Sequence, residues 1–112
     1  MINYKQQDIV LVDFGFSEGT GSKKRPALII SSDNYHKNRQ EAIMAAITGN
    51  IERTLFGDTK IEGWKEAGLL YPSLVMGIIR TIKGNMIIHR LGMLSKPDFQ
   101  KVQKNLKRSM GF

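Results

Sequence analysis

Three cationic side chains, Lys23, Lys24 and Arg25, stand together immediately before a proline and the apolar run 27–30. The preceding loop, residues 17–22, consists mostly of small residues and contains two glycines. A guanidinium binds two phosphate oxygens in parallel, whereas an ammonium acts as a point charge, so the trio suits a phosphodiester backbone. The pattern predicts a phosphate-binding loop at the mouth of a strand.

The overall charge favours the same kind of ligand. The chain has 17 Lys and Arg against 10 Asp and Glu, which gives a formal net charge of +7 and a pI of about 9.9. A basic balance of this size in a small protein is typical of nucleic-acid binding. The alternative is charge that serves only solubility, which many small domains carry. The charge favours a nucleic acid or another polyanion as partner.

The residues that would support several other kinds of chemistry are scarce. The chain has no cysteine, which excludes disulfides, thiolate zinc sites and a cysteine nucleophile. Its two histidines, His36 and His89, are too few for a histidine-rich metal site. We therefore expect no metal and no other cofactor.

Length and hydropathy set the expected organisation and location. A chain of 112 residues is most simply one domain, which we place at residues 1–112. No apolar run approaches the roughly 18 residues that a membrane-spanning helix needs. The first eight residues lack the apolar segment of a signal peptide. We expect a cytoplasmic protein with no membrane partner.

Short apolar runs rich in β-branched residues predict strands, several of them buried on both faces. Pro26 suits the first position of its strand because proline has no N–H to contribute to a ladder. Gly77 interrupts another strand and suggests a bulge or bend. The expected strands are residues 9–12, 27–30, 42–48, 59–61, 74–82 and 86–89.

One clear helix is predicted near the end of the chain. Residues 95–98 form a capping box with a proline in the first turn. The apolar residues that follow are spaced by three and four and share one helix face: Phe99, Val102, Leu106 and Met110. Shorter helical turns are expected at residues 35–39 and 63–68, the second with Trp64 turned inward. The fold class is mostly β, a small barrel with short helical turns and a C-terminal α-helix.

Five segments, taken in order and spacing, resemble the MazF/PemK toxins. They are residues 8–14, 24–31, 46–48, 79–82 and 90–95. Each segment alone is weakly specific, but five segments in matching order and spacing make the resemblance strong. It spans residues 8–110. It implies an SH3-like barrel that pairs as a homodimer, with RNA in a groove near the subunit interface. It also implies a cognate antitoxin that blocks the groove with an acidic, partly disordered tail.

The resemblance further implies a ribosome-independent and metal-independent endoribonuclease that cuts single-stranded mRNA at specific sequences. Without a metal, the adjacent 2′-OH attacks the phosphorus and gives a 2′,3′-cyclic phosphate and a free 5′-OH. The protein must then stabilise a dianionic transition state and manage two proton transfers.

Arg25 and Thr48 match the family's catalytic positions. Arg25 is expected to stabilise the developing charge and, as the resemblance implies, to protonate the leaving oxygen, although an arginine pKa above about 12 makes it a reluctant acid. Thr48 is expected to donate its hydroxyl to a phosphate oxygen. The structural alternatives are a surface arginine at a strand start and a β-branched residue that ends a strand.

Further residues are expected to contact RNA along the groove. Arg80 is equally compatible with a structural role, because it shares a strand face with Ile78 and Ile82. Phe16 or Phe56 can stack on a base, although either fits a core position equally well. The expected RNA contacts are Lys23, Lys24, Ser22, Gly49, Asn50, Arg53 and Arg80.

The chain departs from the family pattern at several positions. Gly49 stands where many members have serine, and Gly77 and Ile78 stand where better-known members have an acid and a glutamine. The acid is one candidate general base, so the base stays unassigned. Three explanations stay open: Arg25 and Thr48 are sufficient for catalysis, the activity is weak, or another residue acts as the base. His36 and His89 are possible substitutes, but nothing in their spacing pairs them.

Two other functions remain open at this stage. The first is a toxin of the same fold that inhibits a protein target, as the CcdB gyrase poisons do. The second is a catalytically weak or inactive relative that binds RNA or an antitoxin, which the Gly77 and Ile78 departures allow.

Overall fold

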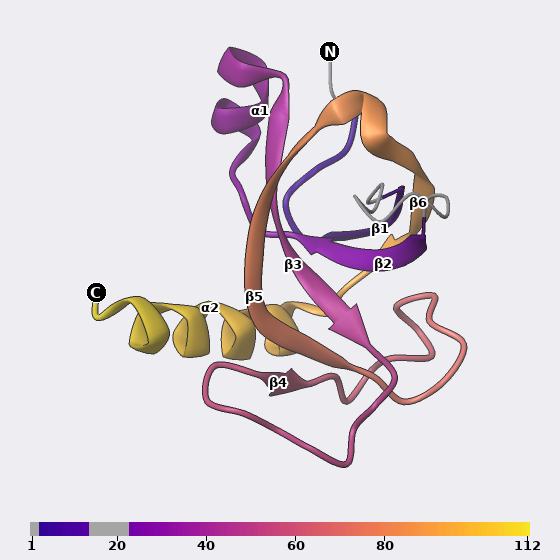
Figure 1. Ribbon diagram of the computed structural model, residues 1–112, viewed down its shortest axis with the longest axis vertical. Coiled ribbons are helices and arrows are strands. Elements are labelled where there is room, and N and C mark those ends of the chain that lie inside the picture. The colour runs from indigo at the N-terminus through magenta and orange to yellow at the C-terminus, as the bar shows by residue number, and fades with distance from the viewer. Residues whose placement is uncertain (1–2, 14–22) are drawn as a thin grey trace.

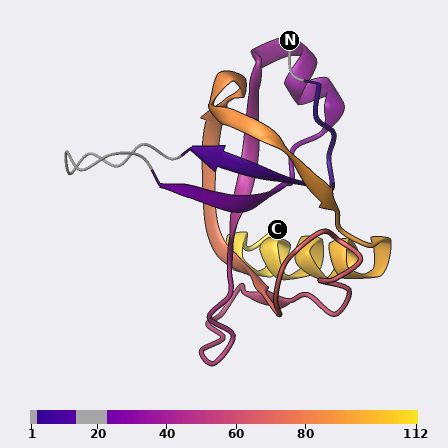
Figure 2. The same ribbon diagram turned by 90° about the vertical axis from the view of Figure 1, so that its right-hand side faces the viewer.

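Within the described residues, six antiparallel strands form one sheet in the order β4-β5-β3-β2-β1-β6. The computed structural model describes residues 3–13 and 23–112. Figure 1 shows the strands, and helices α1 and α2 lie at opposite ends of the sheet in both Figure 1 and Figure 2. The elements are β1 (Asp8–Asp13), β2 (Lys24–Ile29), α1 (Asp33–Arg39), β3 (Glu41–Thr48), β4 (Thr59–Lys60), β5 (Leu74–Lys83), a 3₁₀ turn (Gly84–Met86), β6 (Ile87–Met93) and α2 (Lys96–Met110).

The central strands are buried on both faces, as their continuous apolar runs predict. Successive side chains of a strand point to opposite faces, so β1, β2 and β3 contribute to two separate cores. The first core includes Ile9 and Leu28 and packs against α2 and the segment 61–69. The second includes Val10 and Ile29 and lies on the other face of the same strands.

The sheet curls around the second core and forms an SH3-like small barrel. That core draws on β1, β2, β3, β5 and β6: Val10, Val12, Ala27, Ile29, Ala42, Met44, Ile82 and Ile87. The edge strands of the described sheet, β4 and β6, do not pair with each other, so the barrel stays open. The predicted fold class is confirmed. Within the described residues, no helix is long and apolar enough to cross a membrane.

Helix α2 covers the first core and begins at the predicted capping box. Ser95 is the N-cap, and its Oγ accepts a hydrogen bond from the Asp98 N–H at 3.2 Å. Phe99, Val102 and Leu106 are buried against the sheet. Met110 shares their spacing but is 48% exposed, because the helix ends there and extends beyond the sheet it covers.

The carboxylate of Asp98 ties the segment 61–69 to α2. Asp98 is 2% exposed, and its oxygens accept hydrogen bonds from the Gly63 N–H at 2.9 Å and the Glu62 N–H at 3.3 Å. On the same segment, Glu62 forms an ion pair with Lys101, with 2.9 Å between Lys101 Nζ and Glu62 Oε1. The hydrogen bond within this ion pair raises the pKa of Lys101. Trp64 packs half-buried against the first core, as predicted.

The bulge predicted at Gly77 is confirmed, because the β3–β5 register shifts between Ala45 and Ile47 while β5 runs from Leu74 to Lys83. Other strand bounds differ from the sequence prediction. Strand β2 begins at Lys24, so Pro26 is its third residue and not its first, because the pairing with β1 continues to Lys24. Strand β6 also extends four residues beyond the predicted end at His89, because Arg90 pairs with Val10 and Met93 with Asp8 of β1.

Replacing Asp98 tests how strongly α2 holds the segment 61–69. Asp98→Ala removes two hydrogen bonds to a buried carboxylate, so we expect a loss of about 2–4 kcal/mol in the free energy of unfolding. Urea denaturation followed by circular dichroism measures this loss. Lys101→Ala is the control, because exposed ion pairs contribute little. Equal stability of the two variants would show that Asp98 does not anchor the segment.

Candidate active site

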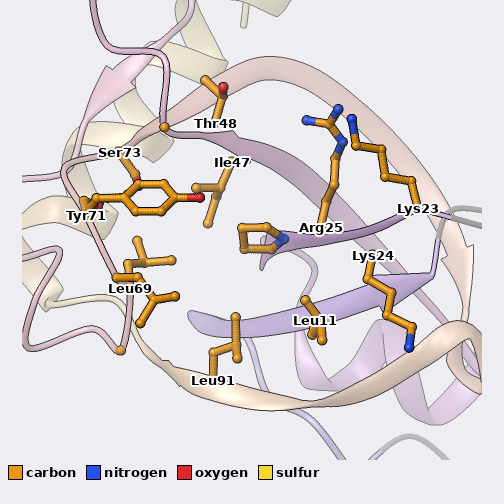
Figure 3. Close-up of a pocket in the computed structure, with 14 residues that line it drawn as sticks. Leu11, Lys23, Lys24, Arg25, Ile47, Thr48, Leu69, Tyr71, Ser73 and Leu91 are labelled. Atoms are coloured by element: carbon orange, nitrogen blue, oxygen red, sulfur yellow. The ribbon is translucent and has the colours of Figure 1, made fainter.

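Arg25 and Thr48 occupy facing positions where the β2–β3 pairing ends. The paired residues of these strands are Ala27 with Ala46, Leu28 with Ala45, and Ile29 with Met44. Continuing that antiparallel register by two residues brings Arg25 opposite Thr48. Facing residues of neighbouring strands point to the same face of a sheet. In Figure 3 the two side chains extend in the same direction.

The backbone of each of the two residues also pairs with a second strand. Arg25 pairs with Val12 of β1, and Thr48 pairs with Leu74 of β5. Both residues are half-buried. The backbone positions of the pair are therefore fixed by ladders on their outer sides, although the strands separate between them.

A pocket of about 510 Å³ opens at this point and gathers five of the residues expected from the sequence (Figure 3). They are Lys23, Lys24, Arg25, Thr48 and Gly49. The remaining lining residues are Leu11, Pro26, Ile47, Gly68, Leu69, Leu70, Tyr71, Ser73 and Leu91. The size lies within the range of pockets that hold small ligands.

The pocket combines cations with an apolar lining. Lys23 and Lys24 are exposed beside Arg25. Apolar side chains supply much of the rest, from four strands and from the segment that precedes β5: Leu11, Pro26, Ile47, Leu91 and Leu69. Such a surface can hold an anionic group at the cationic residues and a flat apolar group against the lining.

The hydroxyl of Thr48 is oriented by the turn that follows it. Thr48 Oγ1 accepts a hydrogen bond from the Asn50 N–H at 3.2 Å. A hydroxyl that accepts through its oxygen keeps its proton for donation to another group. The turn thus fixes the oxygen of Thr48 in a geometry that leaves the hydroxyl able to donate to a phosphate.

Tyr71 lines the pocket and was not predicted from the sequence. Its ring packs directly against Gly49: a Cβ added at residue 49 would lie 2.8 Å from Tyr71 Cδ2 and closer still to Cε2. Gly49 is therefore the residue that lets this ring approach the backbone beside Thr48. The hydroxyl of Tyr71 points into the pocket (Figure 3). Neither periodicity nor a motif marks residue 71, and only the Gly49 departure gives an indirect signal.

Close backbone contacts hold the segment that carries Tyr71. Gly68 has a φ of +92°, and a Cβ there would lie 2.9 Å from the Leu91 carbonyl carbon and 3.3 Å from Gly92 Cα. The Ser73 hydroxyl donates to the Tyr71 carbonyl oxygen at 2.9 Å. The segment thus packs on β6 at one end and is fixed by a turn at the other.

The family model for PemK-like, MazF-like toxins of type II toxin-antitoxin systems matches residues 5–110. The chain belongs to this family. The match covers nearly the whole sequence, including β1, β2 and the position of Thr48. A comparison with curated protein sequences finds no match.

Solved structures of MazF-like proteins share the fold of this MazF-like chain. An endoribonuclease from a mycobacterial species, in complex with its cognate antitoxin, superimposes with a TM-score of 0.78 at 17% identity, covering 97% of this chain and 96% of that chain. MazF from Deinococcus radiodurans gives 0.78 at 16% identity, covering 97% of each chain. The Mycobacterium tuberculosis toxin MazF-mt6 gives 0.73 at 18% identity, covering 92% of this chain and 97% of that chain.

Other residues expected at the site of this MazF-like chain lie elsewhere. Asn50 and Arg53 are exposed on the loop after β3, and Arg80 is exposed on β5 opposite Met44. None of the three lines the pocket. Arg80 is exposed and not partly buried. Ser22 lies outside the described residues, as does Phe16.

Of the positions that depart from the family pattern, Gly49 lines the pocket, whereas Gly77 and Ile78 do not. Gly77 donates its N–H to Asp58 Oδ1 at 2.7 Å, and Asp58 Oδ2 accepts from the Leu55 N–H at 2.9 Å. A carboxylate thus stands beside Gly77, where it fixes the loop before β4. Ile78 is exposed next to it.

Neither histidine reaches the pocket. His36 is 4% exposed within α1, and its Nε2 lies 2.6 Å from Ser31 Oγ, which also accepts from the Ile43 N–H. This arrangement gives His36 a structural place between α1 and β3. His89 is on β6 opposite Leu11 and does not line the pocket. Over residues 3–13 and 23–112, no group of three or more His, Cys, Asp or Glu could hold a metal ion.

Proposed function

We propose that this MazF-like toxin is a metal-independent endoribonuclease that cuts single-stranded mRNA at specific sequences. The observation that carries the proposal is that Arg25 and Thr48 line one cationic pocket, at positions that face each other when the β2–β3 register is continued. The structural relatives support it, because two of them are endoribonucleases of mycobacterial species.

The reaction exchanges one phosphodiester bond for another. The 2′-oxygen attacks the adjacent phosphorus and forms a P–O2′ bond, while the bond from phosphorus to the 5′-oxygen of the next nucleotide breaks. The 2′-hydroxyl loses a proton and the leaving 5′-oxygen gains one. The products are a 2′,3′-cyclic phosphate and a free 5′-hydroxyl, with no net change in atoms or charge.

Arg25 is assigned to the charge that develops on the phosphoryl oxygens. Its planar guanidinium can donate two parallel hydrogen bonds to a phosphate, and these strengthen as the phosphorane forms. Because the residue is half-buried beside the apolar lining, water screens this interaction less than on an open surface. Arg25 also donates toward the leaving oxygen, as the family resemblance implies.

Thr48 is assigned to one phosphoryl oxygen, to which its hydroxyl donates a hydrogen bond. The contact with the Asn50 N–H sets the direction of that hydroxyl. Lys23 and Lys24 hold the phosphates on either side as point charges, which positions the strand without reading its sequence. The described residues that line the pocket include no carboxylate and no imidazole, so we assign the pocket electrostatic stabilisation.

The chain is also proposed to bind a cognate antitoxin. The mycobacterial relative was solved with its own antitoxin, and a Deinococcus radiodurans relative is a MazE–MazF complex. The net charge of +7 and the exposed Lys23 and Lys24 favour an acidic antitoxin segment over the pocket. In that position the segment would exclude RNA from Arg25.

Replacing the two paired residues tests the assignment. In EDTA, Arg25→Ala should lower the cleavage rate of a long RNA by about 10²–10³-fold, because it removes a donor to the transition state. Thr48→Val keeps the side-chain shape and should cost about tenfold or more. Arg25→Lys keeps the charge and should stay well below wild type. The rates are measured by gel mapping of the 5′ ends.

Arg39→Ala is the matched control, because this exposed arginine of α1 pairs with Glu41 and does not line the pocket. Its cleavage rate should equal that of wild type. Intact RNA at high wild-type concentration would refute the nuclease. Full activity of Arg25→Lys would refute the two-point contact, since a lysine cannot supply it.

We further propose that the protein is a homodimer that uses an apolar patch formed by Phe56, Ile78 and Met110. These side chains are 73%, 52% and 48% exposed. The residues next to them in the chain, Gly57, Gly77 and Ser109, lie close together. A Cβ on Gly57 would lie 3.6 Å from Gly77 Cα and 3.7 Å from Ser109 Cβ. Three segments distant in sequence therefore present apolar groups together, which is typical of an interaction surface.

A charge in the patch should prevent pairing. Ile78→Glu and Phe56→Glu should each convert the dimer to a monomer in size-exclusion chromatography with light scattering, because an unpaired carboxylate is costly to bury. Ile88→Glu on β6 is the control, since Ile88 is also an exposed isoleucine. A dimer that survives both patch variants, or a monomeric wild type, would overturn this assignment.

A further inference from the structure

We infer that Tyr71, seated on Gly49, binds one base of the substrate strand by stacking. This inference rests on the proposed function and deepens it, because it names the residue that receives a base beside the scissile phosphate. Tyr71 stands next to the Arg25–Thr48 pair in the same pocket, so phosphate and base contacts would fall within one nucleotide or its neighbour.

The ring of Tyr71 has the exposure that stacking needs. The residue is 58% exposed although it lines the pocket, so much of its surface is open to a ligand. A tyrosine that only completes a core would be largely buried, as Tyr and other aromatic residues usually are inside proteins. The ring lies close to Gly49, whose missing side chain allows this approach to the backbone.

The backbone that carries the ring is held in place before any ligand arrives. The Ser73 hydroxyl fixes the Tyr71 carbonyl at 2.9 Å, and Gly68 packs tightly against β6 on the other side. A side chain with two rotatable bonds on a fixed backbone loses little entropy on binding. Tyr71 is therefore already positioned as a platform.

The pocket beside the ring matches the chemistry of a nucleotide. Ile47 and Leu69 lie near Tyr71 and offer an apolar surface, while Arg25 and Lys23 extend their charged ends at the other side (Figure 3). Single-strand binding sites combine these two elements, a cationic track for phosphates and aromatic side chains for bases. The volume of about 510 Å³ admits a nucleotide with some water.

The same contact accounts for glycine at residue 49. Any residue with a Cβ, alanine and serine included, would place it 2.8 Å from Tyr71 Cδ2 and closer still to Cε2, so the ring would have to move away. Gly49 does not have a positive φ, so its backbone conformation is open to other residues. The constraint on residue 49 is the approach of the ring.

Binding of uncleavable strands tests the platform directly. The probes are fluorescent DNA octamers of dT, dA and dC, which lack the 2′-hydroxyl and stay intact. Tyr71→Ala should weaken the binding of the tightest probe by roughly 10- to 100-fold in fluorescence anisotropy, the range that base–aromatic stacking contributes. Tyr71→Phe keeps the ring and should restore binding to within about threefold.

Two controls separate stacking from other effects. Tyr35→Ala removes an equivalent ring from α1, which does not line the pocket, and should leave binding unchanged. The slope of log Kd against log salt should not change in Tyr71→Ala, because the ring carries no charge. Lys24→Ala should lower that slope by about 0.7, the value for one phosphate contact on a single strand.

A double-mutant cycle tests the role of Gly49. Gly49→Ala should weaken probe binding in the wild-type background, because the added methyl group displaces the ring. In the Tyr71→Ala background the same substitution should have little effect, since no ring remains to displace. Equal losses in both backgrounds would show that Gly49 acts independently of Tyr71.

The inference fails if Tyr71→Ala binds every probe as wild type does, or if Tyr71→Phe is as weak as Tyr71→Ala, which would indicate that the hydroxyl is the functional group. These outcomes are separable from failure of the nuclease proposal. Probe binding that depends on Tyr71 with no RNA cleavage would support the platform and refute the enzyme. Cleavage that ignores Tyr71 would do the reverse.

Discussion

The pairing register of β2 and β3 is the constraint on which the site depends. Their ladder begins at Ala27 and Ala46, beyond Pro26, which has no N–H to contribute to it. Arg25 and Thr48 therefore face each other across strands that have stopped pairing, while β1 and β5 still hold them from outside. A register slip of one residue would turn one of the two side chains to the opposite face. The two buried cores oppose such a slip, because each strand fills both of them with alternating residues.

The pocket joins two physical effects that act on different parts of a nucleotide. The cations of β2 provide long-range attraction and phosphate contacts, which weaken as salt increases. The apolar lining and Tyr71 provide short-range contacts that are insensitive to salt. Gly49 links these two parts, because it follows Thr48 directly and supports the ring of Tyr71. The segment that carries Tyr71 is in turn positioned by Asp98 and by the packing of Gly68 on β6.

Most of the elements could be predicted from the sequence, for specific physical reasons. Apolar runs in β1, β2 and β3 predicted strands buried on both faces, and the capping box at Ser95 predicted the start of α2. The family resemblance predicted that Arg25 and Thr48 act together. The β2–β3 register, when continued, places the two residues opposite each other. Each of the two residues lies within a short sequence motif that can be recognised without knowledge of the fold.

The sequence could not reveal features that depend on contacts between distant segments. Tyr71 enters the pocket because residues 61–73 pack against β6 and α2, and no local pattern encodes that packing. In the sequence, Gly49 is only a departure from a family serine, whereas in the structure the close approach of the Tyr71 ring leaves no room for a Cβ at this position. Arg80 and Arg53 carry the right charge, but their elements place them outside the pocket. Met110 has the spacing of a core residue but lies at the last turn of α2, beyond the sheet.

Arg25 and Thr48 are proposed to promote attack by the 2′-hydroxyl without a metal. Mass spectrometry of the RNA fragments made in EDTA tests it most directly, together with a substrate that carries a single 2′-deoxynucleotide at the mapped cleavage position. We expect fragments ending in a 2′,3′-cyclic phosphate, their partners starting with a 5′-hydroxyl, and no cleavage of the 2′-deoxy substrate. Fragments with a 5′-phosphate and a 3′-hydroxyl, or cleavage at the 2′-deoxy position, would contradict it.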